Sequence, residues 1–198
     1  MQLVDRVKRL LLLPREEWQV IDQESVEVMD LYKSYIAPLA AIGPLCAIFG
    51  MSVVGMSLAG MGIFRFSFGE ALVQSLLSYG LMLGGVYVIA LIIDGLAPTF
   101  GAQRSKSQAL KLAAYASTAY WLGGVFALFP MLGILTLLAA LYSVYLLYLG
   151  LPILMRVPED KAIGYAAVVV LSTIALFIVI GAIRPMPTPI LPSGMLGQ

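Results

Sequence analysis

The sequence predicts an all-α membrane protein, with five transmembrane helices preceded by a cytoplasmic amphipathic helical segment. Three observations predict this fold class. The 198 residues are 61% hydrophobic and 12% charged, whereas about a quarter of the residues in a soluble domain are charged. The apolar runs are continuous rather than alternating, which excludes a closed barrel of strands. The basic residues gather in alternate connections between these runs, which is typical of the cytoplasmic side of membrane proteins.

Residues 1–35 are expected to form the cytoplasmic segment. Apolar residues repeat at helical spacing from Leu3 to Leu11, with charged residues opposite them, so we interpret residues 1–18 as a helix lying on the inner leaflet. The alternative is a helix that packs on the protein's own cytoplasmic loops. A second helix is predicted over 23–35, with Asp22 as its N-cap. The residues expected at the membrane surface are Arg6, Lys8, Arg9, Arg15 and Trp18.

Five apolar runs are long enough to cross a bilayer, which takes about 20 residues at about 1.5 Å per residue. The run over 112–155 has no charge in 44 residues, which is too long for one crossing. Pro130 divides this run, because proline inside a helix removes a hydrogen bond and clashes with the preceding turn. Residues 36–183 are therefore expected to form one transmembrane domain, with spans at about 36–58, 72–97, 110–129, 131–155 and 163–183.

The distribution of basic residues predicts the orientation. The N-terminal segment, the second loop and the fourth loop carry ten of the twelve cations, and the opposite side has only Arg65 and Arg184. By the positive-inside rule the N-terminus is cytoplasmic and the C-terminus lies outside. Residues 184–198, with four prolines in nine positions, are expected to form an extended extracytoplasmic tail.

The residue inventory excludes much chemistry. The chain has no histidine and a single cysteine, Cys46, so it cannot form a His-assisted nucleophile, a His-ligated zinc or haem site, or an internal disulfide. Asp94 is the only aspartate near a span, which argues against a membrane aspartyl protease. We therefore expect a non-enzymatic protein with no catalytic residue, metal or cofactor. A net charge of +1 gives no general attraction to nucleic acid.

Asp94 is the candidate functional residue inside the membrane domain. An acid within a span is costly and often marks function. Gly95 and Pro98 follow it, so it is expected near the inner end of its helix. We interpret it as a structural charge paired with a basic residue of the following loop. The alternative is a role in carrying a proton or an ion. The candidate partners are Arg104, Lys106 and Lys111.

Three tyrosines and two pairs of small residues mark helix contacts. Tyr142, Tyr145 and Tyr148 recur every three residues in the fourth span. Their hydroxyls are expected to bond between helices, or alternatively to line a path for a polar ligand. Two pairs with small-xxx-small spacing permit close helix approach, either within the chain or in a dimer. These pairs are Gly80 with Gly84 and Gly123 with Ala127.

Several phrases of the sequence together resemble the Yip family in its bacterial branch. These membrane proteins were first known as interactors of Rab GTPases. The phrases are Pro14-Arg-Glu-Glu-Trp18, Asp30-Leu-Tyr-Lys-Ser-Tyr-Ile-Ala-Pro-Leu39, Lys111-Leu-Ala-Ala-Tyr115, Phe129-Pro-Met-Leu-Gly133 and Leu141-Tyr-Ser-Val-Tyr-Leu-Leu-Tyr-Leu-Gly-Leu-Pro152.

The resemblance implies five spans, a cytoplasmic N-terminus, a place in the bacterial inner membrane and a non-enzymatic organising or adaptor role. Asp30, Leu31 and Tyr32 match the start of the Asp-Leu-Tyr-Gly-Pro phrase of eukaryotic members, and are candidate partner-binding residues. Lys33 and Ser34 follow here, which does not favour a Rab-type GTPase as partner.

Two functional hypotheses follow. The first is an adaptor that binds the lipid bilayer, other membrane proteins or a second copy of itself. The second is a small transporter, channel or lipid-moving protein, with Asp94 and the tyrosines of the fourth span along its path. A membrane enzyme is the weakest third class.

Overall fold

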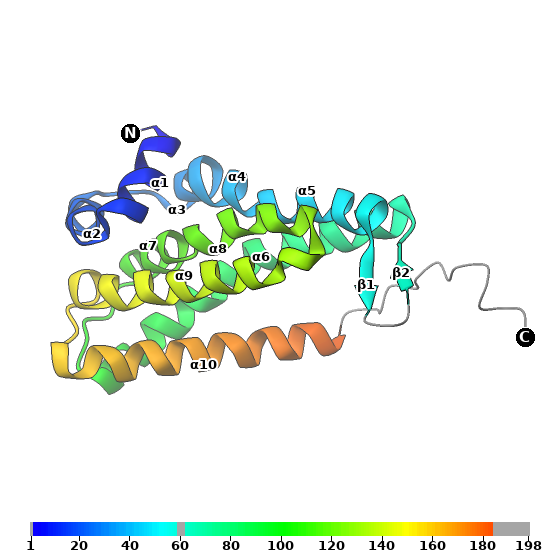
Figure 1. Cartoon of the computed structure of the whole chain (residues 1–198). Coiled ribbons are helices and arrows are strands. Elements are labelled where there is room, and N and C mark those ends of the chain that lie inside the picture. The colour runs from blue at the N-terminus through cyan, green and yellow to red at the C-terminus, as the bar shows by residue number, and fades with distance from the viewer. Residues whose placement is uncertain (1, 59–61, 184–198) are drawn as a thin grey trace, which may run out of the picture.

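Long uncharged runs fold into long helices that form one bundle (Figure 1). The computed structural model describes residues 2–58 and 62–183. Figure 1 shows α6, α9 and α10 running along the bundle, with α1 and α2 at one end and a short hairpin at the other. The helices are α1 (Leu3–Leu12), α2 (Pro14–Gln23), α3 (Val28–Leu31), α4 (Ala37–Ala40), α5 (Ile42–Phe49), α6 (Phe68–Leu96), α7 (Lys106–Ala116), α8 (Thr118–Gly123), α9 (Gly133–Leu154) and α10 (Glu159–Ile183).

Four segments among the described residues are long and apolar enough to cross a membrane. They correspond to the first, second, fourth and fifth predicted spans. The helical fold class and these four spans agree with the sequence prediction. The segments are Val28–Val54, Phe68–Phe100, Gly133–Leu154 and Glu159–Gly181.

The first of these segments is helical but irregular. π-helical stretches at Tyr32–Ile36 and Gly50–Val54 flank α4 and α5. Pro38 lies near the start of α4, and its missing N–H accounts for the wider turn that precedes it. By contrast, α6 begins with a capping box, in which the Ser67 hydroxyl accepts from the Glu70 amide at 3.2 Å.

The third predicted span, 110–129, is a broken helix. It consists of α7, α8 and the 3₁₀ stretch Gly124–Leu128. The break follows Ala116, where the Ser117 hydroxyl donates to the Ala113 carbonyl at 2.8 Å and the Thr118 hydroxyl to the Tyr115 carbonyl at 2.6 Å. Such side chains compete for helix carbonyls and bend helices.

This broken helix still carries the chain from one end of the bundle to the other. The Gln103 N–H donates to the Met155 carbonyl at 2.9 Å, so the chain before α7 and the end of α9 lie side by side. At the far end, the Ala127 carbonyl lies directly against Gly50 in the last part of the first span. A fifth crossing by this segment stays a prediction.

The core lies around α7, at the end of the bundle near the N-terminus. All residues from Ala109 to Ala116 are buried, so this part of α7 has no face that meets solvent or lipid. Residues of α1, α2, α6 and α9 pack around it, and α10 has many exposed apolar side chains in its second half. The apolar surface of α10 is the kind that a bilayer covers.

One expectation needs correction, one element was not expected, and one expectation falls outside the described residues. The predicted helix over 23–35 is wrong in its bounds, because α2 begins at Pro14 and ends at Gln23, and α3 begins only at Val28. Proline favours the first position of a helix, and Asp22 consequently lies in the last turn of α2. An antiparallel hairpin of strands β1 (Met56–Leu58) and β2 (Gly62–Phe64) was not predicted. The predicted tail, 184–198, lies outside the described residues.

Candidate functional site

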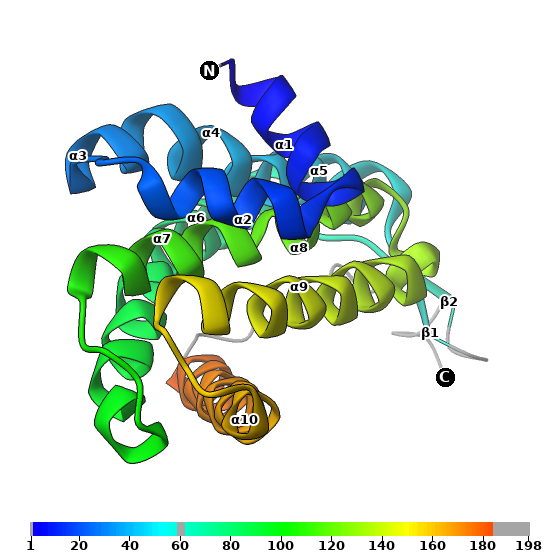
Figure 2. The ribbon, with the colours of Figure 1, turned by 90° about the vertical axis from the view of Figure 1, so that its left-hand side faces the viewer.

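The helices α1 and α2 form a layer, here called the N-terminal cap, that packs against α7 and α9 (Figure 2). Trp18 of α2 fixes this layer. Its ring is fully buried and meets the Tyr115 ring edge-on, with centroids 6.4 Å apart and an interplanar angle of 84°. Gly150 of α9 faces the same ring, and a β-carbon there would lie 2.9 Å from Trp18 Cε2. The expectation that Trp18 anchors the chain at the membrane surface is therefore wrong.

Arg6 is likewise buried and does not face a leaflet. Its Nη1 pairs with Glu17 Oε1 at 2.5 Å, and its Nη2 pairs with Glu24. The guanidinium also lies over the Tyr115 ring, 5.7 Å from the ring centroid, a cation–π geometry. Burial alone lowers the pKa of Arg6, but the hydrogen bond to Glu24 and the neighbouring charges raise it above its ordinary value. Arg6 thus stays charged inside the cap.

A second cation completes the pairing of Glu17. Arg9 Nε lies 2.7 Å from Glu17 Oε2, and the Glu17 side chain is fully buried. Arg6 was placed on the charged face of the predicted helix, but the partners on α2 draw it inward. Lys8, Arg9 and Arg15 are exposed, and they remain candidates for a membrane surface.

The carboxyl end of α2 is held by residues of α7 and by Arg156, which follows α9. Lys111 Nζ donates to the carbonyls of Ile21 and Glu24, each at 2.8 Å, which supplies donors that the end of a helix lacks. Asp22 receives a hydrogen bond from Gln108 Nε2 at 3.1 Å and pairs with Arg156 at 2.7 Å. Lys111 is therefore committed to the cap and does not bond to Asp94.

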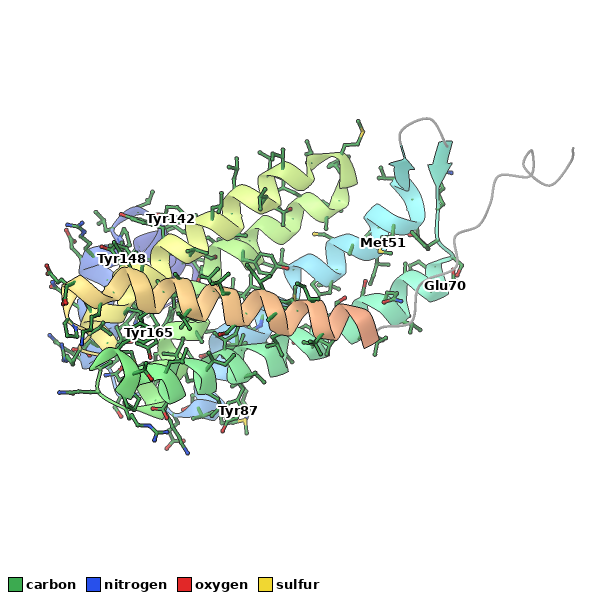
Figure 3. The ribbon with its side chains drawn as sticks, turned by 90° about the horizontal axis from the view of Figure 1, so that it is seen from below. Met51, Glu70, Tyr87, Tyr142, Tyr148 and Tyr165 are labelled. Carbon is green, nitrogen blue, oxygen red and sulfur yellow. The ribbon has the colours of Figure 1, made fainter. Side chains whose placement is uncertain are left out.

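The three tyrosines of α9 do not act together. The Tyr142 hydroxyl donates to the Leu11 carbonyl of the cap at 2.7 Å. Tyr145 is exposed, with its ring centroid 5.6 Å from that of Tyr142, and Tyr148 is half-buried. In Figure 3, Tyr142 and Tyr148 lie at the end of the bundle that carries the cap, and Glu70 lies at the other end. Tyr142 therefore joins the cap to α9.

The Asp30-Leu31-Tyr32 phrase fastens the start of the first span to the bundle. Leu31 is buried, Asp30 is exposed, and the Tyr32 hydroxyl donates to the Leu83 carbonyl of α6 at 2.9 Å. Asp30 is thus the member of this phrase whose side chain a partner can reach most easily.

Asp94 lies near the end of α6, away from the residues of the cap. Its Oδ2 pairs with Arg104 Nη2 at 3.1 Å, and its side chain is buried. Tyr165 of α10 packs nearby, where its hydroxyl donates to the Ile93 carbonyl and its ring stacks on Phe100 at 4.7 Å. Among its three expected partners, the structure places Arg104 against Asp94.

The two small-residue pairs differ in their surroundings. A β-carbon on Gly123 would lie 2.5 Å from Ala139 Cβ of α9, and Ala127 lies against Gly50, so this pair is part of the internal packing. Gly80 and Gly84 are exposed, with no described atom within 4 Å of an added β-carbon. That pair plays no part in packing among the described residues.

Sequence reasoning missed four residues that hold the cap on the bundle. Glu17, Tyr115 and Gly150 build the seat of Trp18 and Arg6, and Lys111 closes it. One signal was present: Glu17 adjoins Trp18 and stands four residues before Ile21, so it shares their face of the helix. A buried acid on an apolar face needs a positive charge beside it, and here a basic side chain, Arg6, supplies that charge. Among the described residues there is no group of three side chains that could hold a metal ion instead.

Comparison with known proteins identifies one matching family and two similar proteins of known location. The Yip1 domain model matches residues 8–180. The inner membrane protein YohC of Escherichia coli strain K12 is 29% identical to this chain over 170 residues, which cover 84% of this chain and 85% of that protein. YohC of Escherichia coli O6:H1 shows the same values. No solved structure matches the chain significantly.

Proposed function

Because this chain belongs to the Yip1 domain family, we propose that it is a non-enzymatic adaptor of the bacterial inner membrane, whose N-terminal cap presents a binding surface on the cytoplasmic side. The named relative YohC is an inner membrane protein, and four apolar helical segments suit a multi-pass protein of that membrane. The cytoplasmic N-terminus and external C-terminus follow from the positive-inside rule.

The two unlike faces of the cap carry this proposal. The inner face is held on the bundle by Trp18, by Lys111 and by Arg6, which lies over the Tyr115 ring. The buried Arg6–Glu17 pair joins α1 to α2. A buried ion pair costs desolvation and requires several matched contacts. Such a seat holds the outer face of the cap in a fixed position relative to the membrane.

The outer face combines apolar and basic side chains. At the corner between α1 and α2, Leu12 is 77% exposed and Leu13 is 50% exposed. Lys8 and Arg15 are also exposed on these helices. An apolar ridge with adjacent cations suits either an anionic membrane surface or an acidic, partly apolar partner protein.

A crosslinking experiment tests the proposal. A photoreactive amino acid at Leu12 should give discrete protein adducts in native membranes. The same probe at Leu138 of α9, which is also exposed, is the control and should react only with lipid. The adducts at Leu12 should weaken when Lys8 and Arg15 are both changed to glutamate. Lipid adducts alone at both positions would refute a protein partner at the cap and would leave the cap as a membrane-surface element.

The transporter hypothesis has less support. Asp94 is paired with Arg104, the Tyr142 hydroxyl bonds to the cap, and Tyr145 faces outward. A polar path needs groups from several helices that converge on one axis. These residues lie in separate contacts, so we favour the adaptor.

A further inference from the structure

A cavity of about 390 Å³, here called the bundle groove, lies between α6, α7, α8, α9 and α10. Its inner wall is apolar and buried, and includes Val86, Ala113, Trp121, Leu147 and Val169. Well-packed protein interiors have few spaces larger than a water molecule. A space of this size falls in the range of ligand sites, about 300–1,000 Å³.

Four hydroxyl groups lie on the wall, and those of Ser117, Ser143 and Thr173 are hydrogen-bonded within the protein. The Ser117 and Thr173 hydroxyls donate to carbonyls of their own helices, both at 2.8 Å. The Ser143 hydroxyl accepts from the Tyr120 N–H at 2.9 Å. These three hydroxyl groups already have partners within the protein. A buried water needs two to four polar partners, so the groove favours an apolar ligand over water.

The groove opens between α9 and α10. Leu137 and Leu141 on α9 and Ile174 and Phe177 on α10 line its mouth, and their exposed fractions range from 42% to 58%. Figure 2 shows α10 set apart from the other helices. All four residues belong to candidate membrane spans, so the mouth faces the hydrocarbon of the bilayer.

The length of the groove matches one leaflet. Along α9 it runs from Leu137 to Leu147, which is about 15 Å at about 1.5 Å per residue. Half of the hydrocarbon core is also about 15 Å.

We infer that the bundle groove binds an acyl chain of a membrane phospholipid. The chain enters between α9 and α10 and lies against Trp121 and Val86. This inference concerns the interior of the bundle and is independent of the cap and its partners. Its failure would leave the proposed adaptor function untouched.

Two adjacent glycines of α6 provide the variant and its control. Gly85 is buried on the groove wall, and no described atom lies within 4 Å of an added β-carbon. Gly85→Leu therefore fills the groove without a clash at its β-carbon. Gly84 has the same free space but is exposed outside the groove. Gly84→Leu makes the same change in helix propensity and leaves the groove open.

Trp121 on the groove wall serves as the reporter, and Trp18 in the cap adds a constant signal. The full-length protein is reconstituted in phosphatidylcholine and phosphatidylglycerol vesicles whose acyl chains carry bromine, a quencher of tryptophan fluorescence. The wild type and Gly84→Leu should be quenched alike. Gly85→Leu should lose most of the quenching, and native mass spectrometry in mild detergent should find fewer retained phospholipids.

Two results would overturn the inference. Equal quenching in both leucine variants would place the lipid outside the groove. No quenching in the wild type would mean that something other than a lipid chain, such as a second copy, covers Trp121. If Gly85→Leu fails to fold, Ala140→Leu fills the groove from the wall formed by α9 and is scored in the same way.

Discussion

Gly150 lies so close to Trp18 that a β-carbon at this position would come within 2.9 Å of the indole ring. The glycine stands inside α9, where alanine is normally the better helix former by about 1 kcal/mol. Its role is therefore to let the cap approach α9 rather than to favour the helix. The cap and the bundle accordingly share one packed core.

Gly150→Ala should destabilise the protein by about 1–3 kcal/mol, because the added methyl group overpacks a fully buried site. Thermal unfolding in mild detergent measures the effect. Gly84→Ala is the matched control, because Gly84 lies inside α6 with open space around it. There the helix propensity acts alone, and stability should rise slightly. A fall of the same size in both variants would show that Trp18 is not seated on Gly150.

Arg6→Met should cost about 3–5 kcal/mol of unfolding free energy, because it leaves buried carboxylate charge without its main partner. Glu17 would keep only Arg9, which lies at the outer side of the pair. Denaturant titration monitored by circular dichroism is a suitable measurement. The double variant Arg6→Met/Glu17→Met should recover much of the loss, since it removes both charges together.

Lys8→Met is the control for the charge change in the same helix. Lys8 is exposed, and a surface substitution of this kind stays within about 0.5 kcal/mol. If Arg6→Met proved as mild as Lys8→Met, Arg6 would lie at a surface and the buried pair would be wrong.

The sequence allowed four spans to be located because each is a long apolar run beside charged connections. It could not separate apolar residues that face lipid from those that face protein. Most residues from Ala109 to Ala116 lie in a predicted span, as do most of those of α10, yet the first are all buried and many of the second are exposed. Hydropathy measures transfer from water, and both surroundings satisfy it equally.

The contacts that hold the cap on the bundle were even harder to predict. Arg6 falls on the charged face of α1 in a helical projection, and only its contacts with Glu17 and Tyr115 draw it inward. Those contacts depend on residues 11 and 109 positions away in the chain. Tryptophan is a residue type often found at membrane interfaces. Here Trp18 is buried instead, because Gly150 has no side chain and leaves space for the indole ring.

Reporter fusions test the orientation and the number of crossings. Fusions at Lys106 and Lys161 should report cytoplasm, and a fusion after Gln198 should report the outside, because ten of the twelve cations lie in the regions assigned to the cytoplasm. The contact between Gln103 and Met155 independently requires both loops on one side. If both loop fusions report cytoplasm, a cytoplasmic C-terminus would mean that α10 does not cross. Loop fusions that report opposite sides would mean that the broken helix from α7 to Leu128 does not cross.

Asp94→Asn distinguishes the adaptor from the transporter. Arg104, the partner of Asp94, is 61% exposed, so it keeps its hydration when the carboxylate is lost. Pairs with an exposed partner are typically worth about 0–1 kcal/mol, and abundance and melting temperature should change little. Arg104→Gln should cost more stability than Asp94→Asn, because it leaves the buried Asp94 carboxylate without its cation.

Flux measurements complete this test. Asparagine matches the shape of aspartate but cannot alternate between a charged and a neutral form, so a proton or ion carrier would lose transport while remaining folded. We expect liposomes with wild-type protein to show no proton or ion flux above empty liposomes. A flux present in the wild type, absent in Asp94→Asn and retained in Arg104→Gln would assign a carrier role to Asp94 itself. That result would replace the adaptor with the transporter.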